Sequence, residues 1–363
     1  MRLVTFGEVM LRLAPEEFLR VAQVLPGRLE ATFGGGEVNV AVSVAQQGGE
    51  AAFATALPDN AITDAFEQEL RRLKVDSALV QRAKNGRFGI YFVETGANQR
   101  AGTVTYDRDY SSISLSSAGD YDWDRIFAGA TWFHITGITP ALSSLSAGAA
   151  IHALKQARER KVPVSCDLNF RKKLWRWKPG VAPVDLARET MRSLMPHIDL
   201  VIANEEDAEM CLGIHAPESN VEAGELNLDG YAQVARQISR DFPNVSRVAI
   251  TLRESISASH NNWGALLYES ATDAVHVAPT GAGGRYEPYE IRNIVDRVGA
   301  GDSFAGGLVF ALNTPGLDDG TTALRYAVAA SCLKHSIKGD FNYASRAEIE
   351  GLMKGGGSGR VQR

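Results

Sequence analysis

The chain has 363 residues, of which 45% are hydrophobic and 22% are charged, and its formal net charge is −5. This length suits one large α/β domain or two ordinary domains, and the composition is that of a globular protein with a sizeable core. The net negative charge excludes a general attraction to nucleic acid or to anionic membranes. Local groups must therefore hold any anionic ligand.

The cysteines and the N-terminus predict a cytoplasmic location. Cys166, Cys211 and Cys332 are odd in number, widely spaced and outside any metal-binding pattern, so we expect buried, reduced thiols. Residues 1–6 run directly into a strand-like segment and lack the features of a signal peptide. No apolar stretch reaches the length that a membrane span needs.

Short apolar runs alternate with amphipathic helical patterns along the chain. The runs predict strands over residues 4–13, 51–57, 132–136, 162–168, 200–203 and 247–252. The helical patterns cover residues 39–47, 62–73, 143–160, 186–195, 231–241, 303–313 and 321–335. Strands that alternate with helices imply a mainly parallel sheet with helices on both faces.

One segment breaks this alternation. Residues 90–94 and 103–106 flank a Gly-containing turn at 96–99, which predicts a β-hairpin. Together with residues near 14–33, this hairpin predicts a small β subdomain attached to the core.

Three further segments carry little pattern. Residues 215–230 and 270–290 are polar and contain glycine, so we predict loops or insertions there. The Gly-rich composition of residues 351–363 predicts a flexible tail.

The most informative segment is Asp296–Phe304, with the sequence Asp-Arg-Val-Gly-Ala-Gly-Asp-Ser-Phe. It follows the strand-like residues 291–295 and opens a helical run. A Gly-Ala-Gly helix start leaves backbone N–H groups unobstructed, and the helix dipole adds partial positive charge, so the segment predicts an anion site. Asp302 in the first turn suits a base that takes a proton from a hydroxyl attacking phosphorus. On glycine spacing alone, an ordinary capped helix after a tight turn is the alternative.

Three motifs resemble those of the ribokinase-like (PfkB) carbohydrate kinases. Gly34–Ala41 is similar to the family's Gly-Gly-x-x-x-Asn segment, and Asp296–Phe304 is similar to its Asp-Thr-x-Gly-Ala-Gly-Asp segment. Asn204–Asp207 lies between them and resembles the Asn-x-x-Glu segment. The resemblance spans about residues 1–350, and both terminal motifs occur in the expected order.

The resemblance implies a single kinase domain over residues 1–350. Its fold would be a three-layer α/β/α core with a mainly parallel sheet and a small β-sheet lid formed by about residues 14–33 and 88–116. ATP would be the phosphoryl donor and Mg²⁺ a further cofactor, and activation by a monovalent cation is left open.

The resemblance also implies roles for particular residues. Asp302 would be the catalytic base, and the amides of Gly299, Ala300 and Gly301 would form the anion hole. The residues that would bind the nucleotide are Asn204, Thr251, Arg253, Gly299 and Gly301. Asp207 would hold magnesium through water.

Three positions depart from the family pattern. Arg297 stands where Thr is usual, so either the entry to the anion turn is repacked or Arg297 meets phosphate. Asp207 replaces a Glu and is one methylene shorter. Arg253 replaces a typical Gly, so the nucleotide loop is expected to differ.

Within the family, the chain looks most like the 2-keto-3-deoxygluconate kinases. The residues that carry this likeness are Tyr91 in Gly-Ile-Tyr-Phe, Tyr106 and Arg108 in Val-Thr-Tyr-Asp-Arg-Asp-Tyr-Ser, Arg171 in Cys-Asp-Leu-Asn-Phe-Arg, and residues 334–342. The substrate of these kinases carries a carboxylate, and the planar fork of an arginine suits a carboxylate. Arg108 and Arg171 are therefore predicted to clamp it, while Tyr91 and Tyr106 bind polar groups and exclude water.

Other predicted substrate contacts come from the N-terminal motif. Gly34 and Gly35 would allow the backbone to approach the sugar closely, and Asn39 would hydrogen-bond a hydroxyl. Structural alternatives remain open for several of these residues. The tyrosines can be cross-strand packing partners and Asn39 a helix cap. Arg108 can belong to a charge cluster with its two Asp neighbours, and Arg171 can begin a basic surface turn.

The sequence thus predicts ATP-dependent phosphorylation of the terminal hydroxyl of 2-keto-3-deoxygluconate, yielding 2-keto-3-deoxy-6-phosphogluconate. A kinase of the same family for fructose, tagatose or ribose is the nearest alternative, and a non-catalytic sugar or nucleotide sensor is a more distant one. Exposed strand edges in the lid predict a homodimer or higher homo-oligomer formed through the lid.

Overall fold

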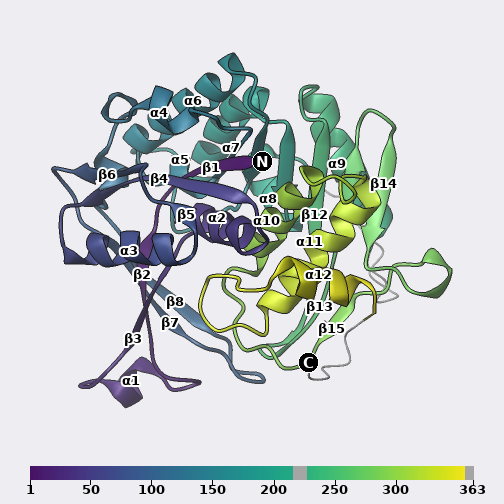
Figure 1. Ribbon diagram of the computed structural model, residues 1–363, viewed down its shortest axis with the longest axis horizontal. Coiled ribbons are helices and arrows are strands. Elements are labelled where there is room, and N and C mark those ends of the chain that lie inside the picture. Colours follow the sequence, from purple (N-terminus) through teal and green to yellow (C-terminus); the bar gives the residue numbers. More distant parts are fainter. Residues whose placement is uncertain (216–226, 356–363) are drawn as a thin grey trace.

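A large mixed sheet forms the centre of the molecule (Figure 1). The computed structural model describes residues 1–215 and 227–355. The sheet has eleven strands, in the order β14-β13-β12-β11-β10-β9-β1-β4-β5, with β15 paired to β13 and β6 paired to β4. Their bounds are β1 Arg2–Phe6, β4 Glu50–Pro58, β5 Val75–Asp76, β6 Val80–Ala83, β9 Trp132–Thr136, β10 Val164–Asp167, β11 Leu200–Ala203, β12 Arg247–Ser257, β13 His260–Glu269, β14 Ala274–Ala278 and β15 Tyr289–Ile291.

The strands from β12 to β5 run parallel, and β13, β14 and β15 add antiparallel pairs at one edge. The parallel strands are apolar at successive positions because both faces of the sheet are buried. In β4, for example, Phe53 packs into the core on one face and Ala54 into the core on the other. The predicted mainly parallel sheet is confirmed.

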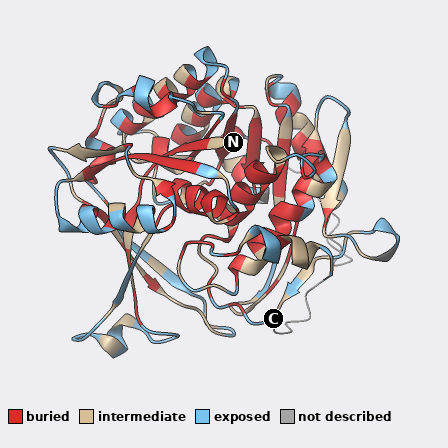
Figure 2. Cartoon of the chain, viewed as in Figure 1, coloured by how far each residue is buried: buried red, intermediate tan, exposed pale blue. Residues whose placement is uncertain are grey.

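Helices cover both faces of this sheet. The helices on one face are α4 Trp123–Phe127, α5 Ile138–Ala141, α6 Ser144–Glu159, α7 Pro183–Leu194, α8 Glu205–Leu212 and α9 Leu228–Asp241. Those on the other face are α2 Gly36–Gln46, α3 Ala61–Arg72, α10 Ala300–Leu312, α11 Gly320–Lys334 and α12 Arg346–Met353. Figure 2 shows the buried residues concentrated in these layers, which make the predicted α/β/α core.

A second, four-stranded sheet extends away from the core at the lower left of Figure 1. Its order is β3-β2-β7-β8, with β2 Met10–Ala14, β3 Glu30–Gly34, β7 Gly89–Glu94 and β8 Thr103–Asp107, and the short helix α1 Val21–Val24 lies between β2 and β3. Much of this sheet is exposed, although Tyr91, Val93 and Met10 form a small buried cluster on it. The expected hairpin and the small separate sheet are both present.

The prediction of one strand over residues 4–13 is wrong. The first strand ends at Phe6 and the next begins at Met10, so β1 belongs to the large sheet while β2 belongs to the small one. Gly7 marks the break, since a Cβ there would lie 2.1 Å from the carboxyl carbon of buried Glu37. An apolar pattern that continues across the break hides this change of sheet.

The edge beyond β11 also differs from prediction. β12 continues to Ser257 rather than ending at residue 252, and it forms a long antiparallel ladder with β13, which the pattern did not predict. Residues 270–290, predicted as loop, contain β14 and the start of β15. β13 was hidden because its first residues, His260, Asn261 and Asn262, are polar.

The C-terminal boundary is shifted as well. Helix α12 reaches Met353, so the first residues assigned to the tail are helical, and residues 356–363 lie outside the described part of the chain. Residues 216–226, within the predicted 215–230 loop, also lie outside it. Within the described residues, no helix is both long and apolar enough to cross a membrane.

Candidate active site

A cavity of about 500 Å³ lies at the carboxyl ends of the parallel strands, between the large and the small sheet. Ligands of open α/β sheets bind at this edge. The predicted residues that line it are Gly35, Asn39, Tyr91, Tyr106, Arg108, Arg171, Asn204, Asp207, Thr251, Arg253, Gly299, Ala300, Gly301 and Asp302. Of the predicted site residues only Gly34 lies behind the lining, where a Cβ would be 2.0 Å from an Asp340 carboxylate oxygen.

The first residues of helix α10 form part of the wall of this cavity. Gly299 is its N-cap and has φ +83°, a left-handed conformation that favours glycine. A Cβ at Gly299 would also lie 2.0 Å from the Asp340 carbonyl oxygen, so this position is closed to larger residues. At Gly301 a Cβ would meet nothing within 4 Å, so the helix start is open towards the cavity. An open helix N-terminus fits a phosphate group.

Asp302 lies in the first turn of α10 and contacts Asn39 from the first turns of α2. The Asn39 Nδ2 atom donates a hydrogen bond of 2.7 Å to Asp302 Oδ2. Burial raises the pKa of Asp302 to about 6, while the Asn39 hydrogen bond opposes the rise. The carboxyl group therefore titrates close to neutral pH, as suits a general base.

A buried ionic cluster lies behind the helix start. Arg12 on β2 donates to Asp340 Oδ1 at 2.7 Å and to Asp296 Oδ2 at 2.6 Å. Tyr91 on β7 donates from its hydroxyl to Asp340 Oδ2 at 2.6 Å. The Tyr91 hydroxyl, predicted to bind substrate, thus already has a carboxylate partner.

Arg108 and Arg171 both line the cavity. Arg108 is 7% exposed and forms an ion pair with the buried Glu8, and its guanidinium carbon lies 5.2 Å from the centre of the Tyr106 ring. Arg171 is exposed, and its Nη1 donates to the Phe170 carbonyl at 3.2 Å. Arg108 is therefore not part of a solvated surface cluster.

Asn204 and Asp207 build the start of α8. The Asn204 side chain accepts from the Glu206 and Asp207 amides, each at 2.9 Å. Asp207 accepts from the Phe170 amide at 2.9 Å and from the Asn204 amide at 3.2 Å. Both residues thus have a structural function, and among the described residues no group of three or more His, Cys, Asp or Glu side chains could hold a metal ion.

Arg297 holds the tip of the β12–β13 hairpin. Its Nε donates to the Ala258 carbonyl at 2.9 Å, and its Nη2 donates to the Ser257 carbonyl. The same tip contacts the small sheet, because the Ala258 amide donates to the Asn98 carbonyl at 2.7 Å. Arg297 thus anchors the tip of the β12–β13 hairpin and also lines the cavity.

Several further lining residues, which come from both sheets and from helix starts, were not among the predicted site residues. Those that line the cavity include Met10, Gly36, Val104, Ile138, Asp167, Asn169, Glu206, Asn261, Trp263, His335 and Asp340. His335 lines the cavity, and its Nδ1 lies 2.8 Å from the Ser331 carbonyl oxygen. Burial and repulsion by Asp207 and Asp302 raise the pKa of Asp167 well above its ordinary value. Asp167 is the last residue of β10 and belongs to the Cys-Asp-Leu-Asn-Phe-Arg segment that ends at Arg171, and these two signals could have identified it.

The model of the pfkB family of carbohydrate kinases matches residues 1–235 and 259–342. The chain belongs to this family. This carbohydrate kinase is similar to 2-dehydro-3-deoxygluconokinase from Thermotoga maritima, with 42% identity and a TM-score of 0.87 over 98% of this chain and 99% of that one.

Two further comparisons extend this likeness. The kinase is 31% identical to 2-dehydro-3-deoxygalactonokinase from Haloferax volcanii, over 98% of both chains. It shares its fold with a putative ribokinase II from E. coli in complex with ATP and Mg²⁺, at 19% identity and a TM-score of 0.72, with 97% of this chain and 99% of that one covered. The predicted family and ribokinase-like fold are confirmed.

Proposed function

We propose that this kinase uses ATP to phosphorylate the terminal hydroxyl of 2-keto-3-deoxygluconate, a name synonymous with 2-dehydro-3-deoxygluconate. Two relatives that match nearly the whole chain carry names of kinases for keto-deoxy sugar acids. The observation that carries the proposal is Arg108, a guanidinium that is buried yet lines the cavity. A buried cation beside a sugar site favours an acidic sugar over a neutral one.

Asp302 is the proposed general base. Its carboxylate is fixed by Asn39 at 2.7 Å, next to the open helix start at Gly301. A sugar hydroxyl placed there would pass its proton to Asp302 as the oxygen attacks phosphorus. Asn39 would keep the carboxylate oriented and favour its ionised form.

The start of α10 is the proposed anion hole. Gly299, Ala300 and Gly301 lie at a helix N-terminus, where the dipole favours negative charge, and the Ala300 amide makes only a long 3.4 Å hydrogen bond to the Arg297 carbonyl. ATP would supply the transferable phosphoryl group, and Mg²⁺ would neutralise charge on its phosphates. Thr251, Arg253 and Asn204 line the cavity and are the proposed nucleotide contacts together with Gly299 and Gly301, and water between Mg²⁺ and Asp207 is the proposed metal contact.

Arg108 and Arg171 are the proposed carboxylate clamp. Glu8 holds the Arg108 guanidinium from behind, and the Tyr106 ring covers it at 5.2 Å. Arg171 is exposed at the mouth, so it is free to turn towards a substrate. Gly35, which lines the cavity, would let the backbone approach the sugar closely, with Gly34 packed behind it against Asp340, and Tyr91 would act by packing, since its hydroxyl binds Asp340.

A neutral-sugar kinase for fructose, tagatose or ribose is the second candidate. The Glu8–Arg108 pair favours it, because a guanidinium already neutralised by a carboxylate attracts an acidic sugar less strongly. A non-catalytic sensor is disfavoured, since a pure binding protein has no use for a base at Asp302.

Product formation over a sugar panel tests the proposal. We expect turnover with 2-keto-3-deoxygluconate or its galacto epimer, and little with gluconate, fructose or ribose. Arg108→Ala should weaken use of the acid sugars and spare neutral ones. Asp302→Asn should lower kcat by about 100- to 10 000-fold while sugar binding persists. A preference for fructose or ribose would reject the acid substrate but keep Asp302 as base.

The remaining proposals have their own tests. We propose one kinase domain over residues 1–350, a homodimer or higher homo-oligomer through the small sheet acting as lid, and a cytoplasmic location. Sedimentation tests the oligomer, and assays in potassium, sodium and cation-free buffers test whether a monovalent cation activates the enzyme.

A further inference from the structure

The Arg12 cluster connects the small sheet to the start of helix α10. Arg12 lies on β2, while Asp296 and Asp340 lie in the segments that precede and adjoin the helix start. All three side chains are buried, with 3% to 5% of each exposed. Among the described residues that line the cavity, Asp340 is present and Arg12 is absent.

Asp296, through its carboxylate, and Asp340, through its backbone carbonyl, both contact the segment around Gly299. Asp296 Oδ1 accepts from the Val298 amide at 3.0 Å, and its Oδ2 accepts from the Gly339 amide at 3.0 Å. The Asp340 carbonyl packs against the Gly299 Cα so closely that a Cβ would lie 2.0 Å from it. The positions of Asp296 and Asp340 therefore fix the helix start from two sides.

Arg12 is the cation that makes this arrangement possible. Two carboxylates buried close together repel each other unless a cation lies between them. The Arg12 fork meets one carboxylate with each of its two terminal nitrogens. The other nearby cation, Lys334, donates to the Ile337 carbonyl at 2.9 Å instead of to either carboxylate.

We propose that Arg12 is a positioning residue for phosphoryl transfer, which holds the anion turn in shape by bridging Asp296 and Asp340. Arg12 acts through these carboxylates and does not touch the substrate. This inference rests on the proposed role of the α10 start, and not on which sugar is phosphorylated. All assays below can therefore use whichever sugar the wild-type enzyme accepts.

Arg12→Ala tests the proposal. Loss of the bridge should shift the backbone at Gly299, and kcat should fall about 100-fold while the KM for sugar changes little. In a plot of kcat against pH, the acid limb is the fall in kcat as Asp302 is protonated. The pH of this fall should rise by about one unit, because uncompensated negative charge disfavours an ionised Asp302. The charged or titratable groups that act on Asp302 are Asp340, Arg171 and Lys334, and all three remain in this variant.

Chemical rescue separates positioning from a merely structural role. Guanidinium ion at millimolar concentration should enter the space left in Arg12→Ala and restore turnover in a saturable way. Arg82→Ala is the matched control, since Arg82 also binds several carboxylates but lies on the surface, and guanidinium should leave it unchanged. An Arg12→Ala enzyme with a wild-type acid limb and no response to guanidinium would overturn the proposal.

Arg12→Lys keeps the test decisive if Arg12→Ala does not fold. Lysine retains the charge but lacks the fork that reaches both carboxylates. We expect a smaller loss of kcat and an unchanged acid limb. Wild-type kcat in Arg12→Lys would show that bridging is unnecessary and would reject the inference.

Discussion

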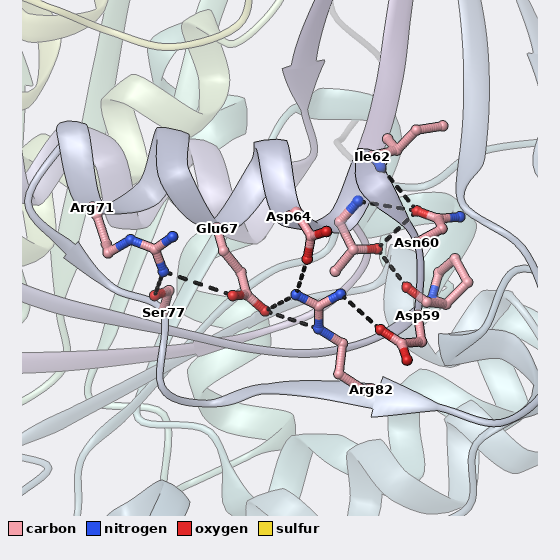
Figure 3. A network of polar contacts seen from close by, with 10 residues as sticks. Asp59, Asn60, Ile62, Asp64, Glu67, Arg71, Ser77 and Arg82 are labelled. Atoms are coloured by element: carbon pink, nitrogen blue, oxygen red, sulfur yellow. Dashed lines mark hydrogen bonds and ion pairs between the residues drawn. The ribbon is translucent and has the colours of Figure 1, made fainter.

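Arg12 and Arg82 each bind more than one carboxylate, but in opposite surroundings. Figure 3 shows Arg82 on β6 meeting Asp59, which precedes α3, and Asp64 and Glu67 on α3. Asp59 is 83% exposed and Asp64 is 59% exposed, so water already solvates these charges. Surface pairs of this kind contribute little to stability.

The Arg12 cluster has no such solvation. Its charges were taken out of water on folding, which is costly, and their mutual attraction only offsets that cost. Burial raises the pKa of Asp340, whereas Arg12 and Tyr91 oppose the rise. The same kind of ion pair therefore has different consequences in the two places. The buried pairs of Arg12 orient groups around the start of α10, whereas the exposed pairs of Arg82 at α3 contribute little to stability or geometry.

Removing the buried cation should have the largest effect. Arg12→Met leaves Asp296 and Asp340 buried without a partner, and we expect the free energy of unfolding to fall by about 3–5 kcal/mol. Urea denaturation of wild type and variant measures this. A loss below about 1 kcal/mol would place Arg12 in the same class as the surface arginine.

Neutralising the whole cluster should restore stability but not activity. In Arg12→Met with Asp296→Asn and Asp340→Asn, no unpaired carboxylate remains in the cluster, although the buried Lys334 loses the favourable charge of both aspartates, so unfolding free energy should return to within about 2 kcal/mol of wild type. Turnover should stay low, because the carboxylates that shape the helix start are gone. Equal recovery of both quantities would mean that the cluster serves folding alone.

Asp302 gives an intermediate, pH-dependent effect. Burial raises its pKa to about 6, so kcat should rise with pH through that value and level off above it. The free energy of unfolding should change with pH in the opposite direction to kcat. Protonated Asp302 favours folding below its ordinary pKa of 3.8, and this contribution to stability is lost as the pH rises through about 6.

Asn39→Ala removes a hydrogen bond to the ionised form of Asp302, so the pH at which kcat falls on the acid side should rise by about one unit. An unmoved limb would separate Asn39 from the base.

The surface cluster should give the smallest effect. Arg82→Met should change unfolding free energy by less than about 1 kcal/mol and leave kcat unchanged. Added salt should reduce even this difference, because exposed charges are screened. A loss comparable to that of Arg12→Met would remove the distinction between the two regions.

The sequence by itself determined the family, the parallel sheet and about half of the cavity lining. Contiguous motifs such as Asp296–Phe304 carry these features, since a helix start and its first-turn carboxylate are close in sequence as well as in space. Strand-like runs buried on both faces are also evident from their composition. The local pattern alone therefore predicts that Asp302 and Gly299–Gly301 share one helix start.

Only the tertiary structure decided which charges meet. Arg108 pairs with Glu8, which is 100 residues away in the sequence. Arg12 pairs with Asp296 and Asp340, which are 284 and 328 residues away. The break after Phe6 and the unpredicted strand β13 depend on pairing between distant segments. Local patterns record helix periods and turns, whereas burial and pairing across the sheets select among charges that look alike in sequence.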